Sequence, residues 1–379
     1  MSDDARPRAV IDAAGHARGW HALLAGGGSG GHIFPALAIA AELAGRGWRV
    51  SFAGSPQGME ARLVPQRGVE FHALPARPLV GKGVLDRARG AAVLMRSTFA
   101  ARKLVKRLGV DVVVGTGGYA SAPAALGARL AGRPVVLFEP NARAGAANRF
   151  LSRFARGAAV SSADAARDLR CDTWLTGVPV RPEFFAVHEA LPGAPAPALL
   201  VLGGSQGARS LNRALPLALA ALAAGAAGPV RVVHQAGERH LEEAREAYAA
   251  AGFASANLRV VAFLDDVAGA MRASDLVISR AGAITLAEIC AASRPSLLLP
   301  LGMAAGHQIE NARALERAGA ARVLAPEEAT AERLAALLGT LLGDREALQG
   351  MARSARQLAH PGAAAAIGDR VTAVVGGAG

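Results

Sequence analysis

The chain has 379 residues, of which 52% are apolar and 4% aromatic, and its formal net charge is +12. This length suits two ordinary domains, and the apolar content is enough for a core in each. The positive charge favours anionic partners such as phosphates, nucleic acid or acidic lipid. No uncharged apolar run is long enough to span a bilayer. Residues 1–18 lack the apolar core of a signal peptide, so we expect a disordered extension there.

Short apolar runs alternate with helical patterns from residue 22 onward, which is typical of a parallel sheet covered by helices. In the first half, helical patterns cover 35–45 and 122–131. The strands expected in this half are 22–25, 50–53, 69–73, 110–114, 135–138 and 158–161. The two cysteines, Cys171 and Cys290, follow no metal or redox spacing, which favours reduced core thiols.

Prolines interrupt the alternation at 179 and 182, and we therefore expect a hinge at 177–181. The alternation then restarts. The strands expected in the second half are 198–202, 230–235, 258–262, 276–279, 296–299 and 321–324. We expect four segments: the extension 1–18, an N-terminal domain 19–178, a C-terminal domain 179–355, and a segment 356–379 whose helix packs back on the N-terminal domain.

Each half opens with a strand, a glycine loop and a helix, written "ALLAGGGSGGH" from residue 22 and "LLVLGGSQGAR" from residue 199. Such loops present backbone N–H groups at a positive helix N-terminus, where phosphate binds. A third glycine turn, "GTGGY", begins at 115. The first loop matches G-x-G-x-x-G, but the next strand lacks the terminal acid that holds a dinucleotide ribose, which counts against NAD. The alternative is a set of tight turns without ligands.

Several polar residues follow strands or begin helices. Glu139 and Asn141 come just after the strand at 135–138, where open sheets bind ligands. Glu288 follows a small-residue turn near a helix start, where it could complement the helix dipole or accept sugar hydroxyls. His307 and Gln308 begin another helix with groups suited to a neutral sugar. Each of these residues could instead serve only in capping or loop structure.

Taken together, the motifs "GGGSGGHIFPALAIA", "GTGGYASAP", "EPNARAG", "TGVPVR", "VLGGSQGARSLN", "SRAGAITLAEI" and "HQIENARALERAGAA" resemble the MurG family of peptidoglycan N-acetylglucosaminyltransferases, in glycosyltransferase family 28. The resemblance runs from about residue 20 to the last helix. It implies an α/β, GT-B fold, in which two Rossmann-like domains with parallel sheets and helices on both faces flank a cleft. The acceptor and membrane would bind the N-terminal domain, and UDP-GlcNAc the C-terminal domain.

The resemblance also implies a reaction. GlcNAc would pass with inversion from UDP-GlcNAc to the MurNAc 4-hydroxyl of lipid I (undecaprenyl-pyrophosphoryl-MurNAc-pentapeptide) and give lipid II. This activity belongs to peptidoglycan synthesis and cell-wall biogenesis, and hence to cell shape and division. The implied partners are UDP-GlcNAc, lipid I, an anionic membrane surface and other cell-wall synthesis proteins, with no nucleic acid. The implied location is peripheral, on the cytoplasmic face of the bacterial membrane.

The site residues carried over by motif fall into three groups. The general base would be His32, with Glu139 as the second candidate; His32 could instead cap its helix or position phosphate. Leu264 would hold the uracil, Ser205 the diphosphate and Glu288 the ribose. The full donor set is Ser29, Gly30, Gly31, Asn141, Arg181, Ser205, Leu264, Ala283, Ile284, Thr285, Leu286, Ala287, Glu288 and Gln308. The acceptor set is Gly28, Gly30, Gly31, Gly117, Gly118 and Tyr119. No metal or other cofactor is expected, since the chain has no D-x-D motif.

The sequence departs from the family pattern at a few positions. Ser29 stands where the family commonly has Thr, and Val178 where it usually has Asn. Pro140 replaces a frequent Gln, and His307 stands at a Gln-type position before Gln308, so we expect the contacts to the donor sugar to differ from the family pattern at these two positions.

The segment 77–107 carries nine Lys and Arg against one acid, within a helical apolar pattern. A basic amphipathic helix can lie on an anionic leaflet. The residues expected to contact the membrane are Lys82, Leu85, Arg89, Arg96, Phe99 and Lys103. The alternative is a solvated basic face whose apolar side belongs to the core.

The sequence is also compatible in part with three other functions. The first is a UDP-sugar epimerase or another GT-B transferase, which the acceptor loops 26–32 and 115–121 argue against. The second is an NAD-dependent oxidoreductase, which lacks its ribose acid here. The third is a nucleic-acid-binding protein, for which the sequence offers charge but no interleaved aromatic residues.

Overall fold

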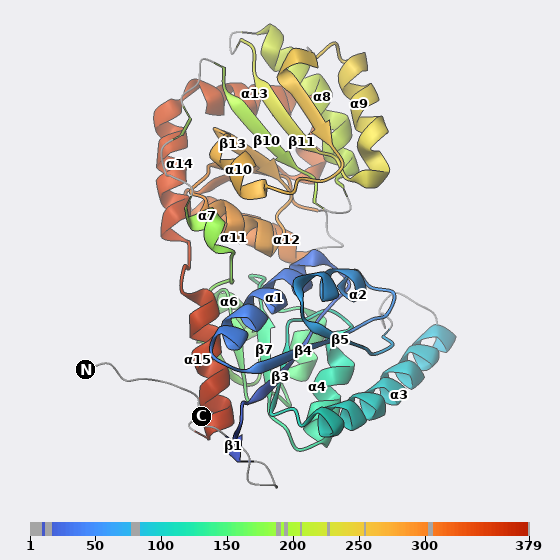
Figure 1. The fold of residues 1–379 in the computed structure, drawn as a ribbon. Helices are drawn as coiled ribbons and strands as arrows, with labels where there is room; N and C mark the ends of the chain where they lie inside the picture. Colours follow the sequence, from blue (N-terminus) through green and yellow to red (C-terminus); the bar gives the residue numbers. More distant parts are fainter. Residues whose placement is uncertain are drawn as a thin grey trace, which may run out of the picture. The chain divides into compact units, whose positions relative to one another are not determined.

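The computed structural model describes residues 10–11, 17–76, 84–186, 191–192, 196–204, 207–225, 228–253, 255–301 and 306–377. The chain forms two compact units, and Figure 1 shows its elements. Unit 1 comprises residues 1–179 and 362–379, and unit 2 comprises Val180–Pro361. Residues 356–361, which we assigned to the terminal segment, thus belong to unit 2. Val10–Ile11 and Ala17–Arg18 (β1 and β2) pair antiparallel, so part of the expected disordered extension has regular structure.

Unit 1 is built on a seven-stranded parallel sheet with the strand order β5-β4-β3-β6-β7-β8-β9. The strands are β3 (His21–Ala25), β4 (Arg49–Gly54), β5 (Glu70–Ala73), β6 (Val112–Gly115), β7 (Val135–Glu139), β8 (Gly157–Val160) and β9 (Asp172–Leu175). The helices are α1 (Gly30–Gly45), α2 (Glu60–Leu63), α3 (Val84–Leu108), α4 (Ser121–Leu130), α5 (Ala146–Leu151), α6 (Ala163–Arg167) and α15 (Ala363–Gly376).

Continuous apolar strands explain why helices cover both faces of this sheet. Every residue of β3, β6 and β7 is buried, which is typical of parallel strands packed on both sides. Leu23 and Ala25 pack in one core with residues of α3 and α4. Because successive strand residues point to opposite faces, Leu24 faces the other side. On that side α1 packs against β3 and β4, and α15 packs against α1 (Figure 1).

Unit 2 is built on a six-stranded parallel sheet with the order β12-β11-β10-β13-β14-β15. The strands are β10 (Ala198–Leu202), β11 (Arg231–Gln235), β12 (Leu258–Val261), β13 (Leu276–Ser279), β14 (Ser296–Leu298) and β15 (Ala321–Val323). The helices are α7 (Pro182–Phe185), α8 (Arg209–Ala224), α9 (Leu241–Ala250), α10 (Val267–Arg272), α11 (Ala283–Ala291), α12 (Gly306–Arg317), α13 (Ala331–Gly343) and α14 (Arg345–Gln357).

The two faces of this sheet carry separate cores. Leu199 and Val201 pack with residues of α8, α9 and α13, whereas Leu200 and Leu202 pack with residues of α7, α10 and α11. The alternation along β10 therefore supplies both layers. Of the helices that the structure describes, each is too short or too polar to cross a bilayer.

The strand order places a direction change in each sheet. β3 lies between β4 and β6, and β10 lies between β11 and β13, so the chain leaves each central strand towards both edges. At such a switch point the loops after neighbouring strands diverge, and ligands bind outside the carboxyl ends of the strands. Both glycine loops predicted from the sequence follow these central strands.

Helix α4 packs so closely on α3 that a glycine is needed at position 127. A Cβ atom on Gly127 would lie 2.6 Å from the Cβ of Ala101 and 2.7 Å from the backbone nitrogen of Arg102. We expect Gly127→Ala to push the helices apart and to lower the free energy of unfolding by about 1–3 kcal/mol. All three tryptophans (Trp20, Trp48 and Trp174) lie in unit 1, so urea unfolding followed by tryptophan fluorescence reports on this unit.

Gly45→Ala is the matched control, because a Cβ atom at the end of α1 would meet nothing within 4 Å. This change should be neutral or stabilise by up to about 1 kcal/mol. Equal unfolding midpoints for the two variants would contradict the packing account.

Candidate functional site

The first glycine loop connects β3 to α1, whose N-cap is Ser29. Gly28 has a φ of +85°, and both Gly28 and Ser29 are exposed. The carbonyl of Ser29 accepts the N–H groups of His32 and Ile33. The N–H groups of Gly30 and Gly31 belong to the first helical turn, which has no partners inside the helix. The loop therefore offers backbone donors at a positive helix end.

The buried carboxylate of Glu60 fixes the position of this loop through hydrogen bonds to backbone N–H groups. Glu60 is 0% exposed, and it accepts N–H groups from Ser55 at 2.9 Å and from Gly28 at 3.2 Å. A side chain on Gly27 would overlap this carboxylate. The sequence analysis did not assign Glu60 to the site, because nothing in its local pattern indicates a partner 32 residues earlier in the chain.

The glycine turn after β6 packs against the first loop and orients His32. Gly117 and Gly118 have φ values of +94° and +73°, and a side chain on Gly118 would overlap the carbonyl oxygen of Gly27. The buried hydroxyl of Thr116 donates to the carbonyl oxygen of His32 at 2.8 Å. The turn and the loop thus form one layer over the carboxyl ends of β3 and β6.

The imidazole of His32 has a defined proton position. Its Nδ1 lies 2.9 Å from the carbonyl oxygen of Thr116. Because a carbonyl oxygen can only accept, Nδ1 carries the hydrogen and Nε2 is the basic nitrogen. The ring is half-buried beside Gly117 and Gly118. This arrangement is what a neutral general base requires.

The carboxylate of Glu139, the second candidate base, forms hydrogen bonds with residues of the loop and helix that follow it. Only 2% of it is exposed, and one carboxylate oxygen accepts the backbone N–H and the side-chain amide of Asn141. The other oxygen accepts from the N–H of Gly145 and the amide of Asn148. This geometry fits the organisation of the 140–148 loop, which also places Asn141 at the carboxyl end of β7.

In unit 2, the turn after β13 leads into α11. The N-cap of α11 is Gly282, and Asn311 of α12 donates to the carbonyl of Ala281 at 3.2 Å. Of the residues assigned to the donor, Ala283, Ile284, Thr285 and Ala287 are half-buried. Leu286 packs in the core, so only its backbone can face a ligand.

Glu288 stands in the second turn of α11, not in the first turn where helix-dipole compensation operates, so the dipole explanation for this acid is wrong. Burial raises its pKa to about 7, although Arg181 opposes this shift. The guanidinium of Arg181 lies 3.9 Å from this carboxylate and 2.9 Å from that of Glu183, and it covers the ring of Phe184. Arg181 and Glu288 therefore share one corner of unit 2.

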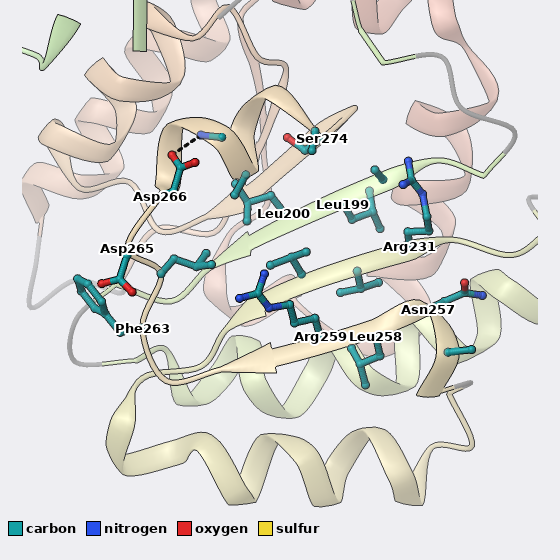
Figure 2. A pocket seen from close by; sticks show the side chains of 18 residues that line it. Leu199, Leu200, Arg231, Asn257, Leu258, Arg259, Phe263, Asp265, Asp266 and Ser274 are labelled. Carbon is teal, nitrogen blue, oxygen red and sulfur yellow. Dashed lines mark hydrogen bonds between the residues drawn. The ribbon is translucent and has the colours of Figure 1, made fainter. Parts of the chain in front are cut away.

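The remaining donor residues are placed as follows. Leu264 is 6% exposed and borders a hollow of about 640 Å³ between α10 and the strands β10–β12. Phe263 and Asp265 lie together at one end of this hollow (Figure 2). Asp266 caps α10 by accepting the N–H of Gly269. Gln308 accepts the N–H of Leu301 at 3.0 Å. Ser205 lies outside the described residues.

The predicted membrane helix α3 exposes apolar and basic side chains together. Met95 and Phe99 are 60% and 53% exposed. Arg89, Arg96 and Lys103 are exposed as well. The opposite side, with Ala101, Leu104 and Val105, is in the core of unit 1. Lys82 and the side chain of Leu85 lie outside the described part of the chain.

A second group of exposed apolar side chains in unit 1 was not predicted from the sequence. Phe150 and Phe154 are 43% and 41% exposed and contact each other edge to face, with the guanidinium of Arg153 6.0 Å from the Phe150 ring centre. Phe150 belongs to α5, which packs on α4. A short apolar helix without a clear period gives no signal that these rings face solvent.

Comparisons with known proteins agree with this architecture. A crystal structure of MurG from Acinetobacter baumannii has a TM-score of 0.77 and 33% identity, covering 93% of this chain and 99% of that one. A putative UDP-N-acetylglucosamine 2-epimerase from Listeria monocytogenes has a TM-score of 0.67 at 14% identity, which shows the fold alone. The two sheets and their helices form the GT-B fold.

Curated relatives match 93% of the chain at a higher identity. A protein of Halorhodospira halophila named UDP-N-acetylglucosamine--N-acetylmuramyl-(pentapeptide) pyrophosphoryl-undecaprenol N-acetylglucosamine transferase is 42% identical over 93% of this chain and 96% of its own length. A relative of the same name from Pseudomonas putida is also 42% identical, over 93% and 97%. Residues 22–160 match the glycosyltransferase family 28 N-terminal domain and residues 198–367 its C-terminal domain. The chain therefore belongs to glycosyltransferase family 28.

Proposed function

We propose that this chain transfers GlcNAc from UDP-GlcNAc to the MurNAc 4-hydroxyl of undecaprenyl-pyrophosphoryl-MurNAc-pentapeptide. The observation that carries this proposal is the match of both halves, at 42% identity, to transferases named for this reaction. The fold alone would not select it, because an epimerase shares the GT-B architecture. The product would enter peptidoglycan synthesis, and contacts with other cell-wall proteins and roles in cell shape and division are part of the same proposal.

In this proposal unit 2 holds the donor. The carboxylate of Glu288 accepts the ribose hydroxyls, and the backbone of Leu264 holds the uracil. Gln308 and Asn141 bind the GlcNAc hydroxyls, and Ser205 meets the diphosphate. The N-terminus of α8, just after the second glycine loop, directs its first N–H groups at that anion. The support within unit 2 is that Leu264 follows β12, Glu288 lies in α11 after β13, and α8 begins after β10. Asn141 belongs to unit 1, after the end of β7.

Unit 1 holds the acceptor in this proposal. The backbone of Gly28, Gly30 and Gly31 and the turn at 117–119 receive its diphosphate. His32 takes the proton of the 4-hydroxyl at Nε2 while that oxygen attacks the anomeric carbon and UDP leaves from the opposite face. We favour His32 over Glu139 because the carboxylate of Glu139 already accepts four hydrogen bonds.

The proposed reaction uses no metal. The negative charge that develops on the leaving diphosphate is stabilised by the N-terminus of α8 and by Arg181, which are fixed before the reaction begins. Arg181 is held in place by its contact with the Phe184 ring and its ion pair with Glu183.

We also propose that α3 rests on an anionic membrane surface, since the acceptor is attached to a lipid. The exposed rings and Met95 would enter the headgroup region, while Arg89, Arg96 and Lys103 pair with lipid phosphates. The exposure of Met95 and Phe99 supports this role, because the alternative of a purely solvated face would place these side chains in the core. The enzyme would then act at the cytoplasmic face of the membrane.

Replacing the proposed base tests the catalytic assignment. We expect His32→Ala to lower kcat by about 100-fold or more, because the carboxylate of Glu139, the second candidate base, already accepts four hydrogen bonds. The affinity for UDP-GlcNAc, measured by calorimetry, should change little. The control is His360→Ala, which removes an exposed histidine of unit 2. A near-wild-type turnover of His32→Ala would remove His32 from this role.

Donor affinity should depend on pH through Glu288. Only the ionised carboxylate can accept both ribose hydroxyls through its two oxygens, because protonation turns one oxygen into a donor, and its pKa is about 7. Affinity for UDP-GlcNAc should therefore be full above this pKa and fall about tenfold per pH unit well below it. Calorimetry at about pH 5.5 and about pH 8 measures this dependence. UDP-GlcNAc is the right probe, since its diphosphate has no proton that titrates in this range.

Two variants test whether the pH dependence comes from Glu288 or from the nearby carboxylate of Glu183. Glu288→Gln should bind more weakly at high pH and show no pH dependence, whereas Glu183→Gln, on the same arginine, should retain it. Equal wild-type affinity at both pH values would contradict the role of Glu288.

Charge reversal on α3 tests the membrane surface. The combined change Arg89→Glu, Arg96→Glu and Lys103→Glu should weaken binding to anionic liposomes by 100-fold or more, at about 1 kcal/mol for each cation lost. Flotation of the protein with the liposomes measures the bound fraction. The control changes Arg239, Arg272 and Arg333 of unit 2 to Glu, which alters the net charge equally. Similar losses for both sets would mean that net charge, and not this helix, determines binding.

A further inference from the structure

Three buried polar side chains form a hydrogen-bonded network beside the second glycine loop of unit 2. Asn212 of α8 and His234 of β11 are 0% exposed, and Tyr248 of α9 is 1% exposed. The amide nitrogen of Asn212 lies 3.0 Å from the carbonyl oxygen of Ala236. The Nε2 of His234 lies 3.1 Å from the amide oxygen of Asn212, and its Nδ1 lies 3.0 Å from the hydroxyl of Tyr248.

The carbonyl of Ala236 fixes the donor and the acceptor of every hydrogen bond in this network of three side chains. The carbonyl of Ala236 can only accept, so the amide nitrogen of Asn212 donates to it. The amide oxygen then faces His234, so Nε2 of that ring carries the hydrogen. Nδ1 is left to accept from Tyr248. Burial lowers the pKa of His234 to about 4 and raises the pKa of Tyr248, so both groups stay neutral around pH 7.

The second glycine loop packs against the backbone of Gln235 and Ala236, and the carbonyl of Ala236 is the one that accepts from Asn212. The N–H of Gly203 donates to the carbonyl of Gln235 at 3.0 Å. The backbone of Gly207, at a φ of +73°, packs so tightly on Ala236 that a Cβ atom would overlap the Ala236 carbonyl oxygen. Asn212 also donates its backbone N–H to the carbonyl of Ala208, just before α8 begins. One side chain therefore links the start of α8 to the end of β11.

We propose that Asn212 is a positioning residue for the donor diphosphate, oriented by His234 and Tyr248. By tying the first turn of α8 to Ala236, it sets the direction in which the helix N-terminus presents its N–H groups. This inference rests on the proposed function, in which that terminus receives the diphosphate of UDP-GlcNAc. The three side chains touch no substrate, and they act through the backbone that does.

A purely structural role makes a different prediction. Buried polar groups are costly when they lose a partner, so any break in the network should lower thermal stability. Only a break at Asn212 should also weaken donor binding, because only Asn212 contacts the backbone at the loop. Tyr248→Phe removes the hydroxyl that donates to His234, the hydrogen bond farthest from the loop. It leaves the side-chain hydrogen bonds of Asn212 to Ala236 and His234 in place, which makes it the matched control.

The test compares Asn212→Ala, Asn212→Asp and Tyr248→Phe by thermal unfolding, by calorimetry with UDP-GlcNAc, and by steady-state kinetics for each substrate. Asn212→Asp keeps the shape and the bond from His234 but cannot donate to Ala236 while it is ionised. This variant carries the test if the alanine variant does not fold. We expect both Asn212 variants to raise the Kd and KM for UDP-GlcNAc about tenfold, with the acceptor KM unchanged. Tyr248→Phe should lower the Tm but leave the Kd within about twofold.

Asn212 variants that lower the Tm without changing the Kd for UDP-GlcNAc would overturn the positioning role. A tenfold weaker Kd for Tyr248→Phe would also overturn it, because the effect would then follow stability and not the link to the loop. If the wild-type chain itself does not bind UDP-GlcNAc, the proposed function fails, and the positioning role fails with it.

Discussion

The switch point in each parallel sheet is the constraint on which the rest of the structure depends. Because β3 and β10 have a strand on either side, the chain leaves them towards both edges of the sheet, and the loops after β6 and β13 turn the other way. Each sheet therefore has one place where helix N-termini and loop backbone meet above the strands. No ligand is needed to create it, since strand order alone does.

Glycine-rich backbone at these places requires support from elsewhere in the fold. Loops without side chains cannot pack themselves, and their N–H groups must be held at fixed positions if they are to bind an anion without reorganising. In unit 1 this support comes from Glu60 and Thr116, and in unit 2 from Asn212 and Asn311. Each is a buried polar side chain that bonds to backbone far away in the sequence. The loop surface that would contact substrate is thus mostly backbone. The side chains that fix the position of this backbone are buried under the loops.

The sequence predicts the strands and the loops that carry the motifs, because buried parallel strands are short apolar runs bounded by glycine. β9 and α1 are among the elements that escape this rule. β9 is an edge strand with exposed residues at both ends and half-buried residues between them, so it has no continuous apolar run. α1 begins at Gly30, five residues before the apolar pattern suggests, because glycines have low helix propensity yet stand here in the first turn.

Within the candidate site, local patterns located His32, Glu139 and Glu288 but not what each one contacts. The four hydrogen bonds to Glu139 come from residues 2 to 9 positions later, which no periodicity reveals. Glu60, Asn212 and His234 act through partners more than 20 residues away. On α3, the sequence cannot distinguish an apolar stripe that faces a core from one that faces outward. The exposure of Met95 and Phe99 makes that distinction.

The measurement that tests the central claim most directly is UDP release from UDP-GlcNAc by the purified chain, with and without a lipid I analogue, in the presence of EDTA. The account predicts release that requires the acceptor and is unaffected by EDTA, because backbone N–H groups and Arg181 supply the positive field. Binding of UDP-GlcNAc without acceptor-dependent release would contradict the proposed acceptor and restore the epimerase or another transferase as the function. Release abolished by EDTA would contradict the metal-free mechanism.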